Sequence, residues 1–133
     1  MNLSLQKLLT LVVVVVAAAA GTLIEETSAA PNCLGTGASA DFEAYKAHVL
    51  DELANVTPTM EGYSYSTKFP PPGSTAAPEA VYGSASCTPD VGDSACASCL
   101  IGAKLSLAQS CAFALYGAVT LPQCTMSFIA VVE

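Results

Sequence analysis

The stretch of residues 87–111 constrains the fold of this chain more than any other, because it contains four of the six cysteines. A loop rich in turn-forming residues follows Cys87, and a run of cysteines and apolar residues at helical spacing then leads to Cys111. Cys96, Cys99 and Cys111 are therefore expected on or near one face of one helix. If their thiols are oxidised, the rest of the domain is tied to this helix.

The beginning of the chain predicts a secretory signal. Residues 1–7 are weakly basic, and residues 8–20 form an apolar run that is shorter than a typical membrane span. A retained membrane anchor is the alternative. It is disfavoured because Glu25 and Glu26 follow the run at a place where anchored segments often carry basic residues.

The small residues Ala29 and Ala30 provide a site for signal cleavage, and residues 18–21 provide an earlier one. We therefore assign residues 1–30 to a signal peptide and residues 31–133 to one domain. No second apolar run of membrane length follows, and an even number of cysteines is typical of an oxidising compartment. The mature chain is expected to be soluble and extracellular, with no membrane span.

Composition and motifs narrow the function. With a formal net charge of -7, the chain is not expected to bind nucleic acid or anionic membranes. It contains none of the common hydrolase or phosphate-binding motifs, and a single histidine, His48, leaves little material for a catalytic triad. His48 is expected to be a boundary residue of a helix rather than a base or a metal ligand. The sequence thus predicts a protein that is not an enzyme and needs no cofactor.

Cys96 and Cys99 have the spacing of a thioredoxin-like redox pair, but the β-α-β context of that fold does not precede them. A zinc site is also not expected, because a second pair of this spacing is missing and His48 lies outside the cysteine cluster in sequence. We therefore interpret the six cysteines as three disulfides rather than as a redox or metal site.

Two helices are predicted. In residues 41–56, apolar side chains recur at steps of three and four, with Ser39 or Asp41 as the N-cap. The second helix contains the cysteine run, with Asp93 or Ser94 as its N-cap. Four charged residues of the first helix are expected to lie on a solvated face: Glu43, Lys46, Asp51 and Glu52.

The remaining segments predict an antiparallel sheet. The candidate strands are residues 31–40 at an edge, 62–69, 80–86, 112–121 and 125–132. The last two are expected to form a closing hairpin, and a proline-rich loop is expected at residues 70–79. The predicted fold class is α+β, with two helices packed on an antiparallel sheet of about five strands and stapled by three disulfides.

The cysteine frame and its surroundings resemble a known family. The segment AVYGSAS precedes Cys87, a CxxCL motif begins at Cys96, and Cys111 and Cys124 follow at the family's spacing. Over residues 31–133 the chain resembles the plant ginkbilobin-homologous domain, also called the stress-antifungal domain, of cysteine-rich repeat secretory proteins and receptor-like kinases. The resemblance implies an apoplastic location and the disulfides Cys33–Cys111, Cys87–Cys96 and Cys99–Cys124.

The resemblance also implies a sugar site. In family members that bind mannose, the sugar is held by an Asn directly after the first cysteine, an Arg six residues before the last cysteine and a Glu five residues after it. Side chains of these types suit sugar hydroxyls, which both donate and accept hydrogen bonds. This chain has Leu34, Ala118 and Ile129 there, which we call the replaced positions. None of them can make a side-chain hydrogen bond, so the mannose site is not expected to function.

Three functions follow from these observations. The first is a secreted plant-defence or antifungal protein that binds a protein or a non-mannose ligand through an apolar patch at the replaced positions. The second is a lectin that uses other residues, such as Tyr63, Tyr65 or Asn32. The third is an apoplastic interaction module for receptor ectodomains, for which an exposed sheet edge would be the sign.

A sequence for N-glycosylation lies near the end of the first helix, at Asn55, Val56 and Thr57. Pro58 follows directly and disfavours modification. The alternative is that Asn55 serves as an ordinary residue at the C-terminal end of the helix. Asn55 is therefore a candidate glycosylation site.

Overall fold

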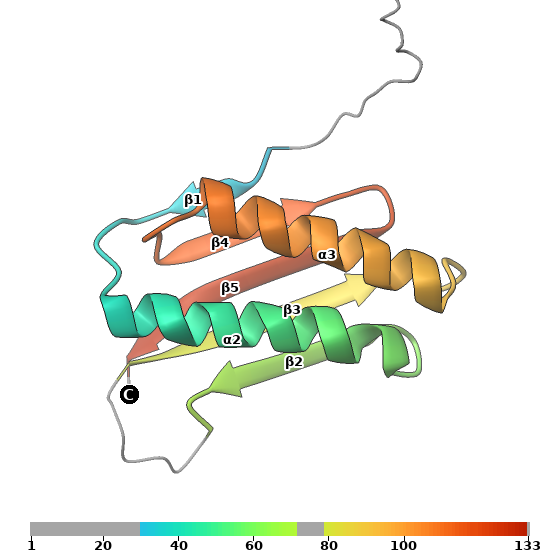
Figure 1. The fold of residues 1–133 in the computed structure, drawn as a ribbon, viewed down its shortest axis with the longest axis horizontal. Coiled ribbons are helices and arrows are strands. Elements are labelled where there is room, and N and C mark those ends of the chain that lie inside the picture. The colour runs from blue at the N-terminus through green and yellow to red at the C-terminus, as the bar shows by residue number, and fades with distance from the viewer. Residues whose placement is uncertain (1–29, 72–78, 133) are drawn as a thin grey trace, which may run out of the picture.

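The computed structural model describes residues 30–71 and 79–132. The elements of these ranges follow in the order β1 (Asn32–Leu34), α2 (Ala40–Val56), the short 3-10 helix η2 (Thr57–Thr59), β2 (Ser64–Phe69), β3 (Glu79–Cys87), α3 (Asp93–Ser110), β4 (Tyr116–Thr120) and β5 (Cys124–Val132). The helices α2 and α3 contact each other and lie over the same face of the sheet (Figure 1).

The described strands form one five-stranded antiparallel sheet in the order β1-β4-β5-β3-β2. β3 and β5 pair over their full lengths, from Glu79 opposite Val132 to Cys87 opposite Cys124. β4 and β5 form the predicted closing hairpin, and β1 is the predicted edge strand. Both strands are shorter than predicted: β1 covers Asn32–Leu34 of residues 31–40, whose last residue begins α2, and β4 covers Tyr116–Thr120 of residues 112–121. The predicted α+β fold with three disulfides is therefore confirmed.

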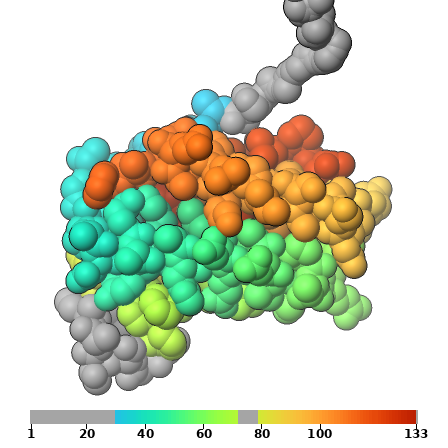
Figure 2. Space-filling view, in the orientation of Figure 1, coloured from blue at the N-terminus to red at the C-terminus, as the bar shows by residue number. Residues whose placement is uncertain are grey.

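Alternate side chains of the strands point toward the helices and form the core. Val81, Val119, Met126 and Phe128 of the three central strands are buried in this layer. The helices fill it with side chains that are almost fully buried: Phe42, Val49, Leu50, Leu53, Leu100, Ala103 and Leu107. Figure 2 shows α2 and α3 covering the near side of the molecule. We call the face of the sheet turned away from these helices the open face.

Two glycines allow the layers to approach closely. A Cβ atom on Gly83 of β3 would lie 2.5 Å from Cγ1 of Val49, so α2 can rest on the sheet only because this side chain is absent. A Cβ atom on Gly117 of β4 would lie 2.5 Å from the ring of Phe128. Both distances are shorter than any normal contact between carbon atoms.

The start of α2 agrees with the prediction and the start of α3 does not. The hydroxyl of Ser39 accepts a hydrogen bond from the backbone N–H of Phe42 at 3.0 Å, as an N-cap should. At α3 the N-cap is Gly92, with φ of 90°, and not Asp93 or Ser94. The Asp93 carboxylate lies one position inside the helix and accepts a hydrogen bond from the Tyr63 hydroxyl at 2.6 Å, so it is engaged elsewhere.

The three disulfides have the pairing that the family resemblance implied. Cys87–Cys96 joins the end of β3 to the first turns of α3, and Cys99–Cys124 joins α3 to the start of β5. Cys33–Cys111 joins β1 to the residue that ends α3. Each bridge therefore has one end on α3 or at its terminus, and the described chain has no free cysteine.

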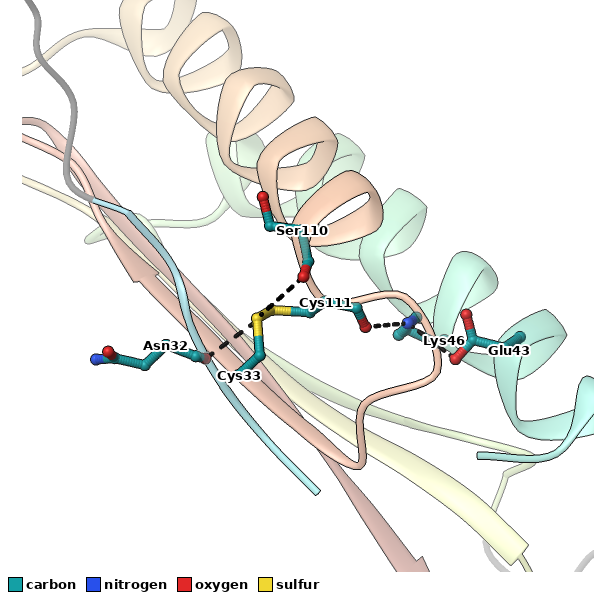
Figure 3. The surroundings of a disulfide bond; sticks show 6 residues. All are labelled: Asn32, Cys33, Glu43, Lys46, Ser110 and Cys111. Carbon is teal, nitrogen blue, oxygen red and sulfur yellow. Dashed lines mark hydrogen bonds and ion pairs between the residues drawn. A yellow bond between two sulfur atoms is a disulfide. The ribbon is translucent and has the colours of Figure 1, made fainter. Parts of the chain in front are cut away.

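Lys46 corrects the prediction of a fully solvated outer face on α2. Its side chain is buried, with only 3% of the residue exposed. The ammonium group donates a hydrogen bond to the backbone carbonyl of Cys111 at 3.0 Å and lies 2.9 Å from the Glu43 carboxylate (Figure 3). It also lies 4.9 Å from the centre of the Phe128 ring. The sequence pattern missed this because a lysine that caps another helix cannot be told from a surface lysine by spacing alone.

Two predictions fall mainly outside the described residues. The signal peptide of residues 1–30 lies there except for Ala30, and so do residues 72–78 of the proline-rich loop. The signal peptide and the domain boundary at residue 31 stay predictions. Among residues 30–71 and 79–132, no helix is long and apolar enough to cross a membrane.

Candidate functional site

The three replaced positions come together on the open face. Cys33 points toward α3 through its disulfide, so its neighbour Leu34 points the other way. Leu34 pairs with Tyr116 of β4, and Tyr116 pairs in turn with Ile129 of β5. Ala118 lies two residues after Tyr116 and therefore on the same face of the same strand.

Tyr116 lies at the centre of this group, and sequence reasoning missed it. It sits directly between Leu34 and Ile129, which places these two strand positions about 10 Å apart across two strand intervals. Leu34 is 64% exposed and Ile129 is 43% exposed. On the other side of Ile129, β3 contributes Tyr82, which is 44% exposed. Strand alternation from Cys124 shows that Ile129 points to the open face. The register of the β4–β5 hairpin, which the sequence does not reveal, is then needed to place Tyr116 opposite it.

We call Leu34, Tyr116, Ile129 and Tyr82 the apolar row, because they occupy directly opposed positions on β1, β4, β5 and β3. On one side of this row the neighbouring rows carry small hydroxyl side chains, and on the other side Ala80 pairs with Val131. The hydroxyl oxygens of Ser84 and Ser127 lie 3.2 Å apart, and those of Ser86 and Thr125 also lie 3.2 Å apart. The open face thus combines one row of large side chains with a flat surface of hydroxyl groups.

A groove opens beside the apolar row, at the end of the sheet where β1 leads into α2. Its volume is about 590 Å³, and its lining includes Leu34, Ile129, Phe42 and Val132. Among the described residues that line it, Glu79 is the charged one. The Glu79 carboxylate accepts a hydrogen bond from the Ser39 hydroxyl at 2.8 Å. The groove therefore suits an apolar group better than a sugar.

The aromatic residues considered for an alternative sugar site do not form a common cleft. The Tyr65 hydroxyl donates to the Glu52 carboxylate at 2.5 Å, which raises the pKa of Tyr65 above its ordinary value. The Tyr63 hydroxyl donates to Asp93, which likewise raises the pKa of Tyr63. Asn32 lies on β1, at the opposite edge of the sheet from the strand that carries Tyr65. A lectin site shared by Tyr63, Tyr65 and Asn32 is therefore not supported.

The titratable residues of α2 are engaged in local contacts. His48 is exposed, and the centre of its ring lies 4.0 Å from the centre of the Phe69 ring. Asp51 forms an ion pair with Lys104 at 2.8 Å, while Glu52 accepts hydrogen bonds from β2. Within the described residues, no group of three or more His, Cys, Asp and Glu side chains could hold a metal ion. Cys96 and Cys99 each bond to a cysteine outside the helix, so they are not a redox pair.

The candidate glycosylation site lies away from the open face. Asn55 is exposed in the last turn of α2. Thr57, the third residue of the sequence motif, is fully buried, and its hydroxyl has no hydrogen-bond partner. Modification of Asn55 therefore stays a prediction.

Comparison with known proteins defines the class of this chain. The family model described as salt stress response/antifungal matches residues 32–130. The chain therefore belongs to the salt stress response/antifungal family. No curated protein matches it.

Two solved structures share the fold. The tandem DUF26 ectodomain of the Arabidopsis thaliana cysteine-rich receptor-like protein PDLP5 is 18% identical, with a TM-score of 0.65, over 78% of this chain and 50% of that one. The corresponding ectodomain of PDLP8 is 14% identical, with a TM-score of 0.66, over 79% and 50%. This chain spans about half the length of these relatives. At these identities the likeness shows the fold alone.

Proposed function

We propose that this chain is a secreted, non-enzymatic binding protein of the plant-defence type, and that its docking surface is the apolar row of the open face. The observation that carries the proposal is the exposure of Leu34 and Ile129 on either side of Tyr116. Large apolar side chains on a sheet face that no described helix covers are typical of a surface that binds a partner.

Mannose is not the ligand in this proposal. A sugar hydroxyl needs directional donors and acceptors, and the side chains at the replaced positions offer neither. Ala118 and Ile129 occupy diagonal positions on adjacent strands, about 7–8 Å apart. An arginine and a glutamate at these places would reach one ligand, whereas a methyl group and a butyl group leave an apolar surface. The docked group is therefore a protein side chain or another apolar moiety.

The defence role can be tested with matched variants. Ile129→Glu places a charge in the apolar row, while Ile101→Glu places the same charge on the outer face of α3, where Ile101 is 50% exposed. We expect the oxidised protein to inhibit fungal growth, Ile129→Glu to abolish inhibition, and Ile101→Glu to retain it. Equal activity of all three proteins would contradict a role for the open face. Lack of inhibition by the unsubstituted protein would contradict the antifungal role.

Secretion into the apoplast is part of the same proposal. It is supported by the three disulfides, which persist in oxidising compartments, and by the extracellular origin of the ectodomains that share the fold. The apolar run of residues 8–20 supports a cleaved signal. Expression in plant cells followed by N-terminal sequencing of the extracellular protein tests this. A start near residue 31 is expected, and retention of the chain inside the cell would contradict it.

A second candidate function is an interaction module for receptor ectodomains. It is supported by β2, a six-residue strand at the edge of the sheet, and by the receptor-like proteins among the solved relatives. An edge strand can pair with a strand of a partner. Replacing Ser66 in the middle of β2 with proline removes one backbone donor and is expected to weaken such pairing. An unchanged affinity for an ectodomain partner would argue against binding through this edge.

A further inference from the structure

None of the acidic residues in residues 30–71 and 79–132 points its carboxylate from the open face. Eight acidic residues lie in the described ranges: Asp41, Glu43, Asp51, Glu52, Glu61, Glu79, Asp90 and Asp93. Seven of them belong to α2, α3 or the loops, and the eighth, Glu79 of β3, turns its carboxylate to Ser39 at the start of α2. Among the outward side chains of the five strands, Lys68 of β2 is the charged one. The open face is therefore neutral apart from one lysine.

This distribution matters for contact between identical chains. Without residues 1–30 the chain keeps nine acidic residues and three lysines, a net charge of -6. Two such copies repel each other, and the repulsion is strongest where carboxylates face each other. The open face lets two copies meet without placing any described carboxylate at the contact. Its two tyrosines, and the absence of acidic side chains among its described residues, are features of the centre of a protein interface.

The inner three positions of the apolar row are symmetric about its middle, whereas the outer two differ, since Leu34 of β1 lies beyond Tyr116 and Lys68 of β2 lies beyond Tyr82. β5 is the central strand of the sheet, and its Ile129 is flanked by Tyr116 on β4 and Tyr82 on β3. A two-fold axis that runs along β5 over Ile129 would place Tyr116 of one copy opposite Tyr82 of the other. Ile129 would then face its own counterpart. A surface that is complementary to itself in this way is what a two-fold dimer requires.

We propose that the open face takes a second copy of this chain and forms a symmetric dimer through the apolar row. This inference rests on the proposed function, because it names the partner of the same docking surface. With the axis turned by about 15° from β5, the two sheets pack face to face at about −30°, as in a β-sandwich. The hydroxyl rows beside the apolar row form the polar part of the contact.

The size of the open face predicts a weak dimer. The strands have three to nine residues, about six on average. With four strand intervals of about 4.8 Å and about 3.3 Å per residue, the face measures about 400 Å² at the average strand length and about 600 Å² at the length of β3 and β5. Two such faces bury on the order of 800–1,200 Å², which is the lower end of specific interfaces. The dimer is therefore expected to form in the micromolar range and to become tighter as salt screens the net charge.

Sedimentation velocity of the oxidised protein, from the low-micromolar to the millimolar range, tests the proposal. The unsubstituted protein is expected to shift from monomer to dimer as its concentration rises. Ile129→Glu would place two carboxylates against each other at the axis and should weaken dimerisation at least about a hundredfold. Leu34→Glu, at a more exposed site of the same row, should weaken it as well. Ile101→Glu on α3 should leave the dissociation constant within about twofold.

Three results would overturn the dimer: a monomer at all concentrations, a dimer that survives both Ile129→Glu and Leu34→Glu, or one that is lost with Ile101→Glu alone. Circular dichroism and a free-thiol assay confirm that each variant is folded and oxidised.

The proposed function can fail independently of the dimer. If the protein stays monomeric but Ile129→Glu still loses growth inhibition, the dimer is wrong and the docking surface stands. If the dimer is lost but inhibition is unchanged, the dimer stands and the defence role of this face is wrong.

Discussion

The ammonium group of Lys46 on α2 donates a hydrogen bond to the backbone carbonyl of Cys111, 65 residues away, at 3.0 Å. Cys111 ends α3, so its carbonyl has no partner within the helix, and it accepts this bond in addition to one from the backbone N–H of Ala114 at 3.1 Å. The Glu43 carboxylate and the Phe128 ring complete the surroundings of this buried charge. The contact thus joins the two helices next to the Cys33–Cys111 disulfide (Figure 3).

Replacing Lys46 with methionine is expected to lower the free energy of unfolding by about 2–4 kcal/mol, because the Cys111 carbonyl and the Glu43 carboxylate both lose a buried partner. Lys104→Met is the matched control, since Lys104 is half-buried and pairs with the exposed Asp51. Its cost should be below about 1 kcal/mol. Urea unfolding of the oxidised proteins measures both values. Equal losses would show that the burial of Lys46 is not important for stability.

Two glycine substitutions should act in opposite directions. Gly117→Ala places a methyl group 2.5 Å from the Phe128 ring and should destabilise the protein by about 1–3 kcal/mol. Gly102→Ala lies on an open part of α3, where a Cβ atom meets nothing within 4 Å, and should stabilise it by about 0.5–1 kcal/mol. Thermal unfolding monitored by circular dichroism measures both. A stabilising effect at Gly117 would mean that β4 and β5 pack differently.

The hydrogen bond between Tyr65 and Glu52 predicts that the folded protein loses stability at alkaline pH. The negative acceptor raises the pKa of Tyr65, so the folded state holds this proton more tightly than the unfolded state does. The stabilisation is fully present below the ordinary tyrosine pKa of about 10 and is lost as the pH rises through the raised value.

Glu52→Gln should lower the pKa of Tyr65 toward its ordinary value and reduce the loss of stability at high pH. Asp51→Asn is the control, because Asp51 pairs with Lys104 and not with a tyrosine. The chain has five tyrosines and no tryptophan, so the ultraviolet absorbance of tyrosinate reports the titration without interference. If Glu52→Gln left the titration curve unchanged, this hydrogen bond would not exist in solution.

The three disulfides should differ in their contributions to stability. They close loops of 78, 25 and 9 residues, for Cys33–Cys111, Cys99–Cys124 and Cys87–Cys96. Chain-entropy reasoning predicts losses of about 4–5, 3–4 and 2–3 kcal/mol when each pair is replaced by alanines. Guanidinium unfolding of the three double variants tests the order. The largest loss on removal of the shortest loop would contradict it.

Sequence reasoning predicted the fold well because its strongest signals are local or covalent. The helical spacing around Val49 and Leu53, the Ser39 cap and the cysteine frame each specify an element with little help from the rest of the chain. The disulfide pairing came from the family resemblance and was confirmed. The prediction of the α3 N-cap was wrong because the Asp93 carboxylate accepts a hydrogen bond from Tyr63, which lies 30 residues earlier in the sequence.

The candidate site was harder to predict, because it depends on strand register. Leu34 and Ile129 could be named from their distances to cysteines, but Tyr116 and Tyr82 join them only through the pairing of β1, β4, β5 and β3. The burial of Lys46 depends in the same way on where α3 ends. Contacts of this kind arise from the packing of distant segments, which periodicity along one segment does not reveal.

The central claim is that the open face binds a partner other than mannose. The most direct test is binding of the oxidised protein to a panel of immobilised glycans that includes mannose and fungal cell-wall mannan. The account predicts no mannose-selective binding by the unsubstituted chain, and a gain of such binding in the triple variant Leu34→Asn, Ala118→Arg and Ile129→Glu, which restores the polar side chains of the family. Mannose-selective binding by the unsubstituted chain would contradict the account.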